Sequence, residues 1–181
     1  MEAVVAVYSD WGIGAQGTQP LVVPADRVRF RELTTGHAVI VGRKTLGDFP
    51  GGRPLKNRHN IVITRQNITI DGAEVVHDME EAMEKAKAHE RCFVIGGASV
   101  FKEFYPHLTK VHLTKIDAAP FSDSFFPDLD AAEDWHCTQA EEWAEHEGIR
   151  YQFSTYERKK TRSPSPFAWR PDFLAAPREA H

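Results

Sequence analysis

A carboxylate on an otherwise apolar helix face is the first feature of this sequence that could do chemistry. Pro24 and Asp26 predict the start of a helix, because proline and an acidic residue favour the first turn. Asp26, Phe30 and Leu33 then lie on one stripe of that helix. Burial there would favour the neutral carboxyl and prepare it to handle a proton or to pair with a cationic ligand. The alternative is a helix-terminus acid that faces water and interacts with the helix dipole.

Two predicted strands, residues 37–41 and 60–63, end in clusters of hydroxyl and cationic side chains. The clusters are Gly42, Arg43, Lys44 and Thr45 after the first strand, and Thr64 and Arg65 after the second. Such groups suit a phosphate, and the carboxyl ends of parallel strands are where open α/β sheets bind ligands. The alternative for each cluster is a solvated basic turn. Between them, Arg53 and Arg58 flank a basic stretch that could hold a carboxylate.

A glycine pair separates a third predicted strand from a helix. Residues 93–95 are apolar, Gly96 and Gly97 follow, and residues 98–104 have helical spacing of their apolar side chains. This arrangement can turn backbone N–H groups toward an anion, and glycine lets a flat ring approach the main chain. The alternative is a tight turn that binds no ligand.

Composition narrows the classes of protein. The chain has 181 residues, 41% of them hydrophobic, with a net charge of −4, so a general nucleic-acid binder is not expected. No apolar stretch approaches the roughly 20 residues that span a bilayer, and the N-terminus has no signal-peptide pattern, so we expect a cytoplasmic protein. Cys92 and Cys137 have neither metal-ligand nor redox spacing, and we expect no metal site.

Hydrophobic patterning predicts eight strands, at residues 3–8, 37–41, 60–63, 74–76, 93–95, 110–116, 134–139 and 150–156. The last two are expected to form a hairpin across an acidic loop. Helices are expected from Pro24, over residues 78–89 and over residues 98–104. Residues 159–181 are rich in proline and arginine and predict an extended or disordered tail without its own core.

Taken together and in order, these motifs resemble the dihydrofolate reductase family over residues 1–158, with one extra residue near Pro50. The matching segments are GIG at 12–14, PAD at 24–26, VGRKT at 41–45, RPLKNRHNIVIT at 53–64, VIGGASVF at 94–101, LTKID at 113–117 and DSFFPD at 123–128. The resemblance implies one α/β domain over residues 1–158. Its central sheet would have eight mostly parallel strands and an antiparallel C-terminal hairpin, flanked by about four helices.

The implied activity is NADPH-dependent reduction of 7,8-dihydrofolate to tetrahydrofolate, with hydride added to C6 and a proton to N5. Such an enzyme supplies one-carbon and thymidylate metabolism, and the resemblance implies a cytoplasmic monomer that binds neither nucleic acid nor membrane. Two alternatives keep the fold. One is a reductase of another dihydropterin or of a riboflavin-pathway pyrimidine, and the other is a non-catalytic pterin-binding protein.

The resemblance also implies site residues. Asp26 would bind the amino-pyrimidine edge of the pterin and support protonation of N5, Thr114 would hydrogen-bond Asp26 and the substrate, and Arg58 would pair with the folate α-carboxylate. The implied catalytic set is Asp26, Leu21 and Thr114. The implied substrate-binding set is Val4, Val5, Asp26, Phe30, Phe49, Arg53, Leu55, Arg58, Ile95 and Thr114.

NADPH would lie along the glycine pair and the cationic strand ends, under a mobile lid formed by residues 9–23. Its implied contacts are Ala6, Ile13, Gly14, Gly42, Arg43, Lys44, Thr45, Thr64, Arg65, His77, Gly96, Gly97, Ala98, Ser99, Val100 and Phe101. In the family the peptide between the two glycines is cis. Two departures from the family pattern stand out: Leu21 replaces a tryptophan whose N–H orders a water near the carboxylate, and Arg27 replaces an apolar residue.

Overall fold

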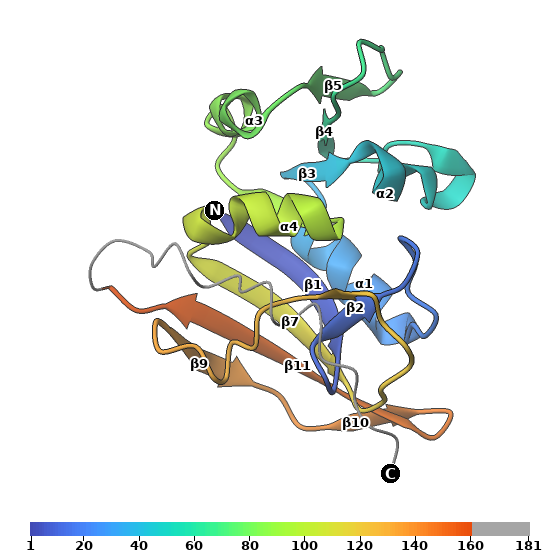
Figure 1. Cartoon of the computed structure of the whole chain (residues 1–181), viewed down its shortest axis with the longest axis vertical. Coiled ribbons are helices and arrows are strands. Elements are labelled where there is room, and N and C mark those ends of the chain that lie inside the picture. Colours follow the sequence, from blue (N-terminus) through green and yellow to red (C-terminus); the bar gives the residue numbers. More distant parts are fainter. Residues whose placement is uncertain (161–181) are drawn as a thin grey trace.

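One mixed β-sheet organises residues 1–160, which are the residues that this computed structural model describes (Figure 1). The sheet has the strand order β10-β11-β7-β1-β6-β3-β4-β5, with β9 paired to β11. Its strands are β1 (Glu2–Tyr8), β3 (Ala38–Gly42), β4 (His59–Ile63), β5 (Ala73–Val76), β6 (Cys92–Gly96), β7 (Lys110–Ile116), β9 (Trp135–Ala140), β10 (Ala144–His146) and β11 (Ile149–Arg158). The predicted tail, apart from its first two residues, lies outside the described residues.

The sheet confirms the predicted mostly parallel arrangement. Strands β7, β1, β6, β3, β4 and β5 run parallel, and β11 is antiparallel to β7. Because β9 and β10 pair with different stretches of the same edge of β11, the sheet has eight strand positions. The predicted C-terminal hairpin forms between β9 and β11. Strand β10 forms inside the expected acidic loop, where fully exposed side chains leave no hydrophobic alternation to detect.

Within residues 1–160 four α-helices flank the sheet, which is the number that the family resemblance implies. They are α1 (Pro24–Thr34), α2 (Arg43–Gly47), α3 (Met79–Ala86) and α4 (Ala98–Phe104), with 3₁₀ turns at Pro50–Gly52 and Tyr105–His107. Helices α1 and α4 lie on opposite faces of the sheet (Figure 1). Helix α3 is shorter than residues 78–89, and Asp78 caps its N-terminus by accepting a 2.8 Å hydrogen bond from the Glu81 N–H.

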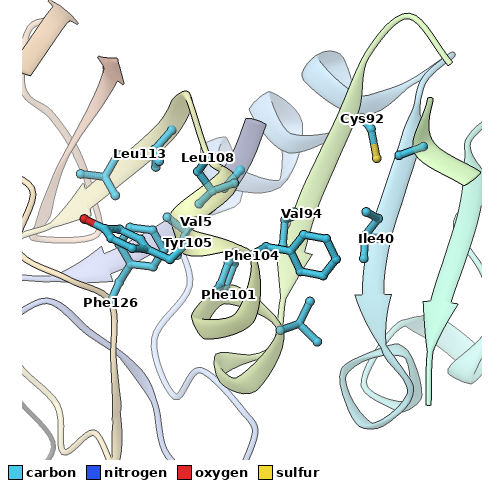
Figure 2. Packing of buried hydrophobic residues seen from close by; sticks show 14 of the residues in the cluster. Val5, Ile40, Cys92, Val94, Phe101, Phe104, Tyr105, Leu108, Leu113 and Phe126 are labelled. Atoms are coloured by element: carbon cyan, nitrogen blue, oxygen red, sulfur yellow. The ribbon is translucent and has the colours of Figure 1, made fainter. Parts of the chain in front are cut away.

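Alternation along β1 divides the core between the two faces. Val5 packs with Val94, Phe101 and Phe104 under α4, where Figure 2 shows their side chains together. Val4 faces the other way and packs, with Val39 and Phe93, against Phe30 and Leu33 of α1. The apolar stripe predicted for α1 is therefore confirmed, and burying it fixes the direction in which Asp26 points.

A two-stranded sheet lies beside the main one. Strand β2 (Gly12–Gly14) pairs with β8 (Ser124–Phe125), so the segment after β1 is held against the loop that follows β7. This pairing anchors the beginning of the predicted lid, while its end leads into α1.

Candidate active site

Asp26 on α1 and Thr114 on β7 form the centre of the site. The Thr114 hydroxyl donates a 2.6 Å hydrogen bond to Asp26 Oδ1, and Thr114 is 1% exposed. Burial raises the pKa of Asp26 above its ordinary value, although the Thr114 hydrogen bond and the charges of Arg29 and Arg27 oppose this shift. Such a carboxyl can hold a proton at a higher pH than an exposed aspartate. The alternative of a fully solvated helix-terminus acid is therefore wrong.

An apolar wall adjoins this carboxyl. Val4, Phe30, Leu55 and Ile95 pack in one cluster, and Ile95 also contacts the cluster that contains Phe49. Five of the predicted substrate-binding side chains are thus brought together.

The prediction for Val5 is wrong as far as its side chain is concerned. Val5 belongs to the core cluster on the opposite face of the sheet, under α4. Successive residues of a strand point to opposite faces, so Val4 and Val5 cannot both face α1. Only the backbone of Val5 remains available to the site.

Arg58 is fixed at the C-terminal end of α1. Its Nε donates to the Lys56 carbonyl oxygen at 2.8 Å, and its Nη1 donates to the Thr34 hydroxyl at 3.2 Å. Burial and the nearby positive charge of Arg31 both lower the pKa of Arg58. Two guanidinium groups close together are suited to an anionic ligand. The sequence analysis did not identify Arg31, because its position off the apolar stripe indicates only solvent exposure.

Arg53 is the other cation predicted to bind substrate. Its side chain is exposed. None of the contacts that fix Arg58 involves Arg53.

The predicted cofactor residues lie along one edge of the sheet. Register places Gly96 beside Val41 and Gly42 beside Ile63, which in turn lies beside Val76. Because these four strands are parallel, their carboxyl ends open at the same edge. The two cationic clusters, the glycine pair and His77 therefore emerge next to one another, as the sequence predicted.

The glycine pair needs glycine for steric reasons. The peptide between Gly96 and Gly97 is cis, and Gly96 has φ +130°. A Cβ on Gly97 would lie 2.7 Å from the Thr45 hydroxyl oxygen, so α2 leaves no room for a side chain at Gly97 unless Thr45 moves. Val100 and Phe101 direct buried side chains into the core, which leaves only their backbone for a ligand.

The cations at this edge differ in exposure. Arg43 is half-buried, whereas Lys44 and Arg65 are exposed. His77 Nδ1 lies 3.0 Å from the Thr64 carbonyl oxygen, which holds the ends of β4 and β5 together. Ile13 of β2 is half-buried and packs on the core below α4, and Gly14 ends the same strand.

The sequence analysis did not predict two contacts at the end of the lid. The Tyr8 hydroxyl donates to the Leu21 carbonyl oxygen at 2.9 Å and accepts from the Leu21 N–H at 3.1 Å. The Gln19 side-chain amide donates to the Ala6 carbonyl oxygen at 3.0 Å. Leu21 packs its side chain with Ala6 and Tyr8, so an apolar residue occupies the position of the family tryptophan. The position of Tyr8 on the α1 face could have been predicted from alternation, but no sequence pattern indicates the role of Gln19.

Comparison with known proteins decides the family. The sequence profile described as "Dihydrofolate reductase" matches residues 1–158. The chain belongs to the dihydrofolate reductase family. It is 34% identical over 152 residues to the dihydrofolate reductase of Bacillus subtilis, covering 82% of this chain and 89% of the relative. It is 35% identical over 166 residues to dihydrofolate reductase HdrB of Haloferax volcanii, covering 87% and 82%.

A solved structure of the same family agrees with the fold. Dihydrofolate reductase from Enterococcus faecalis, complexed with NADP(H) and RAB-propyl, superposes with a TM-score of 0.77 at 32% identity. The match covers 87% of this chain and 95% of the other. Nothing in the structure explains Arg27, which is exposed.

Two further observations concern residues 1–160. No helix in this range is both long and apolar enough to cross a membrane. No cluster of three or more His, Cys, Asp or Glu side chains in the same range is arranged to hold a metal ion.

Proposed function

We propose that this protein reduces 7,8-dihydrofolate to 5,6,7,8-tetrahydrofolate with NADPH, and so supplies one-carbon and thymidylate metabolism. The observation that carries the proposal is the hydrogen-bonded pair of the partly buried Asp26 and the buried Thr114, beside the apolar wall formed by Val4, Phe30 and Ile95. Membership of the dihydrofolate reductase family supports it. We propose further that the protein acts in the cytoplasm as a monomer.

Asp26 is the proton-handling group of the proposed mechanism. The carboxyl binds the amino-pyrimidine edge of the pterin, with Thr114 fixing its orientation through the 2.6 Å hydrogen bond. Its raised pKa supports protonation at N5, because a partly buried carboxyl keeps its proton at a pH where an exposed one is ionised. The apolar wall excludes water from the flat ring and leaves the carboxyl as its polar contact.

NADPH supplies the hydride for C6 when bound, and the carboxyl-end edge of the sheet fits this cofactor. The absence of side chains at Gly96 and Gly97 leaves their backbone open to a ligand, and a Cβ on Gly97 would collide with Thr45. Arg43, Lys44 and Arg65 supply positive charge for the additional phosphate that distinguishes NADPH from NADH. The Ala6 carbonyl oxygen, next to Thr114 in the register, would accept from the nicotinamide amide.

Arg58 and Arg31 favour folate over a pterin without a glutamate tail. Arg58 is oriented by two hydrogen bonds and lies near a second cation, which suits carboxylates rather than a neutral side chain. A tail-less dihydropterin and a riboflavin-pathway pyrimidine both lack the glutamate carboxylates that these charges would bind.

The test is NADPH oxidation by the purified protein with dihydrofolate, with dihydrobiopterin and without a second substrate. We expect turnover with dihydrofolate at a kcat/KM well above that with dihydrobiopterin, and at least tenfold lower kcat/KM when NADH replaces NADPH. Arg43→Ala should reduce the NADPH preference, because charge-assisted hydrogen bonds contribute about 1.5–3 kcal/mol each. Binding of dihydrofolate without turnover would contradict the proposed reaction, and equal use of both cofactors would contradict the cofactor assignment.

A further inference from the structure

Arg29 lies on α1 one turn after Asp26 and has no role in the mechanism above. Its side chain reaches under the helix to two strands of the sheet. Nη1 donates to the Leu113 carbonyl oxygen at 2.8 Å, and Nη2 donates to the Ser154 carbonyl oxygen at 3.3 Å. The guanidinium also lies over the Phe153 ring, 4.7 Å from its centroid.

The two carbonyl groups lie at the level of the site. Leu113 precedes Thr114 on β7, and the register pairs Leu113 with Ser154 and Thr114 with Phe153 of β11. One planar guanidinium therefore joins α1 to both strands beside the residue that binds Asp26. The fixed fork of arginine can span two acceptors in this way, whereas the single ammonium of lysine cannot keep the same geometry.

The hydrogen bonds of Arg29 do not neutralise its charge. Backbone carbonyls are neutral, so they satisfy the N–H groups without cancelling the positive charge. Burial lowers the pKa of Arg29, and the negative charges of Asp26 and Glu141 raise it. Because the ordinary pKa of arginine is above 12, the group stays protonated across the working pH range.

We propose that Arg29 is a positioning residue for Asp26, which ties α1 to β7 and β11 at the level of Thr114 and keeps a positive charge beside the Asp26 carboxyl. The positive charge opposes the effect of burial on the protonation of Asp26. Burial alone would hold the carboxyl protonated, whereas a nearby guanidinium keeps its ionised form accessible, so that the group can both release and regain a proton. This inference rests on the proposed function only in giving Asp26 a catalytic task.

Each element around Asp26 contributes to its electrostatic environment. Its own helix provides Arg29 and Arg27, and β7 provides the neutral hydroxyl of Thr114. On the α1 face of β1, Tyr8 packs with Leu21, and burial raises its pKa further above neutrality, so it adds no charge there. Beyond Arg29, the segment after β9 provides Glu141. Arg29 and Arg27 are therefore the two cations to compare, one half-buried and bonded to the sheet, the other exposed.

The exposed Arg27 offers a matched control. Both residues carry one positive charge on the same helix, so Arg29→Met and Arg27→Met remove the same formal charge. Methionine is preferred to alanine because Arg29 also lines a cavity of about 430 Å³ behind α1, which truncation would enlarge. Arg29→Lys keeps the charge and loses the two-strand attachment.

The experiment is a carbon-13 NMR titration of the Asp26 carboxyl in the ligand-free protein, with the resonance assigned by its loss in Asp26→Asn. We expect Arg29→Met to move the titration midpoint upward by about one pH unit, the lower end of the effect that a nearby opposite charge has on a carboxyl. Arg27→Met should move it less than half as far, because water screens an exposed charge. Arg29→Lys should restore most of the native midpoint.

A second measurement uses the native protein and tests how salt affects the titration midpoint of Asp26. Raising KCl from 0.1 to 1 M should leave the native midpoint nearly unchanged, because a half-buried charge is screened less than an exposed one. A midpoint unchanged in Arg29→Met, or one that salt raises by about a pH unit, would overturn the proposal. The pH profile of the hydride step should shift with the NMR midpoint while the Kd for NADPH stays constant. If the protein does not reduce dihydrofolate, the NMR arms still decide the role of Arg29.

Discussion

The side-chain amide of Gln19 donates a 3.0 Å hydrogen bond to the backbone carbonyl oxygen of Ala6. Gln19 lies in the proposed lid, and Ala6 lies beside Thr114 in the register of β1 and β7. The nicotinamide carboxamide of NADPH is also a primary amide, and the proposed function directs it to the same oxygen. The lid residue therefore bonds to the same oxygen that the proposed function assigns to the cofactor.

We expect Gln19→Leu to bind NADPH more tightly than the native protein. Leucine has a similar size but cannot donate, so the cofactor would no longer compete with this hydrogen bond. A neutral hydrogen bond contributes about 0.5–1.5 kcal/mol, which corresponds to roughly a 2- to 12-fold decrease in Kd. Cofactor fluorescence would measure the change. Thr18→Val is the control, because the Thr18 hydroxyl bonds only within the lid, to the Ala15 carbonyl oxygen. A Kd unchanged or weakened in Gln19→Leu would rule out the competition.

Replacing Asp26 or Thr114 should separate proton supply from binding. Asp26→Asn should lower the single-turnover rate of hydride transfer by orders of magnitude and leave NADPH binding intact. In the native protein this rate should fall as pH rises through the raised pKa of Asp26, because the protonated carboxyl is lost. Thr114→Val removes a hydrogen bond that lowers that pKa, so the fall should move to higher pH. A fast rate that is independent of pH and survives Asp26→Asn would contradict the mechanism.

Sequence patterns predicted the parts of the site that depend on local structure. The helical spacing of Asp26, Phe30 and Leu33 indicated which way the carboxyl points, because the stripe must be buried. The two cationic strand ends could be placed together because parallel strands end at one edge of a sheet. The register between β3, β4 and β6 then brought them beside the glycine pair, as expected.

The remaining contacts join residues that are distant in the chain, and one sequence does not show which of these residues meet in the fold. Arg29 and Gln19 bond backbone carbonyls 84 and 13 residues away, and a backbone acceptor has no sequence signature. The family resemblance implies that Val5 lines the pocket, whereas the alternation of β1 turns its side chain to the opposite face of the sheet. The Tyr8–Leu21 contact could have been suspected, since a tyrosine among buried apolar residues needs a partner for its hydroxyl.

Arg58→Ala should discriminate between substrates. Dihydrofolate should lose affinity corresponding to about 2–5 kcal/mol if its carboxylate pair is well desolvated, whereas a tail-less dihydropterin should lose little. The measurement is kcat/KM for both substrates in native protein and variant. Arg53→Ala is the comparison, and its effect should be smaller because Arg53 is exposed. Equal losses for both substrates in Arg58→Ala would make Arg58 structural, through its bonds to Lys56 and Thr34.

The last prediction concerns stability at acid pH and depends on Glu2, at the start of β1. Glu2 Oε1 lies 2.9 Å from His112 Nε2 and accepts from Arg91 Nη2 at 2.8 Å, and Arg91 Nε donates to Oε2 at 3.0 Å. Burial raises the pKa of Glu2, but the hydrogen bonds from His112 and Arg91 outweigh it and lower the pKa from 4.5 to about 2. The cluster joins β1 and β7 to Arg91, the residue just before β6, at the end of the sheet away from the cofactor edge.

The direction of the pH effect follows from this lowered pKa. The unfolded chain takes up the Glu2 proton near pH 4.5, whereas the folded protein does so only near pH 2, so the stabilisation is complete above pH 4.5 and is lost between these values. A shift of this size corresponds to at most about 3 kcal/mol. We expect urea unfolding of the native protein to show a falling free energy from pH 5 to 2, and Glu2→Gln to be less stable at pH 7 with a shallower fall.

Glu74 provides the matched control for Glu2. It also binds a histidine and a cation, with His59 Nε2 at 2.8 Å and Lys85 Nζ at 3.1 Å, but its side chain is 33% exposed against 16% for Glu2. Solvent screening should therefore make the effect of Glu74→Gln smaller, and 1 M salt should reduce it further. If Glu2→Gln kept the native pH dependence, or if both variants lost equal stability, the buried cluster would not be the source of the acid sensitivity.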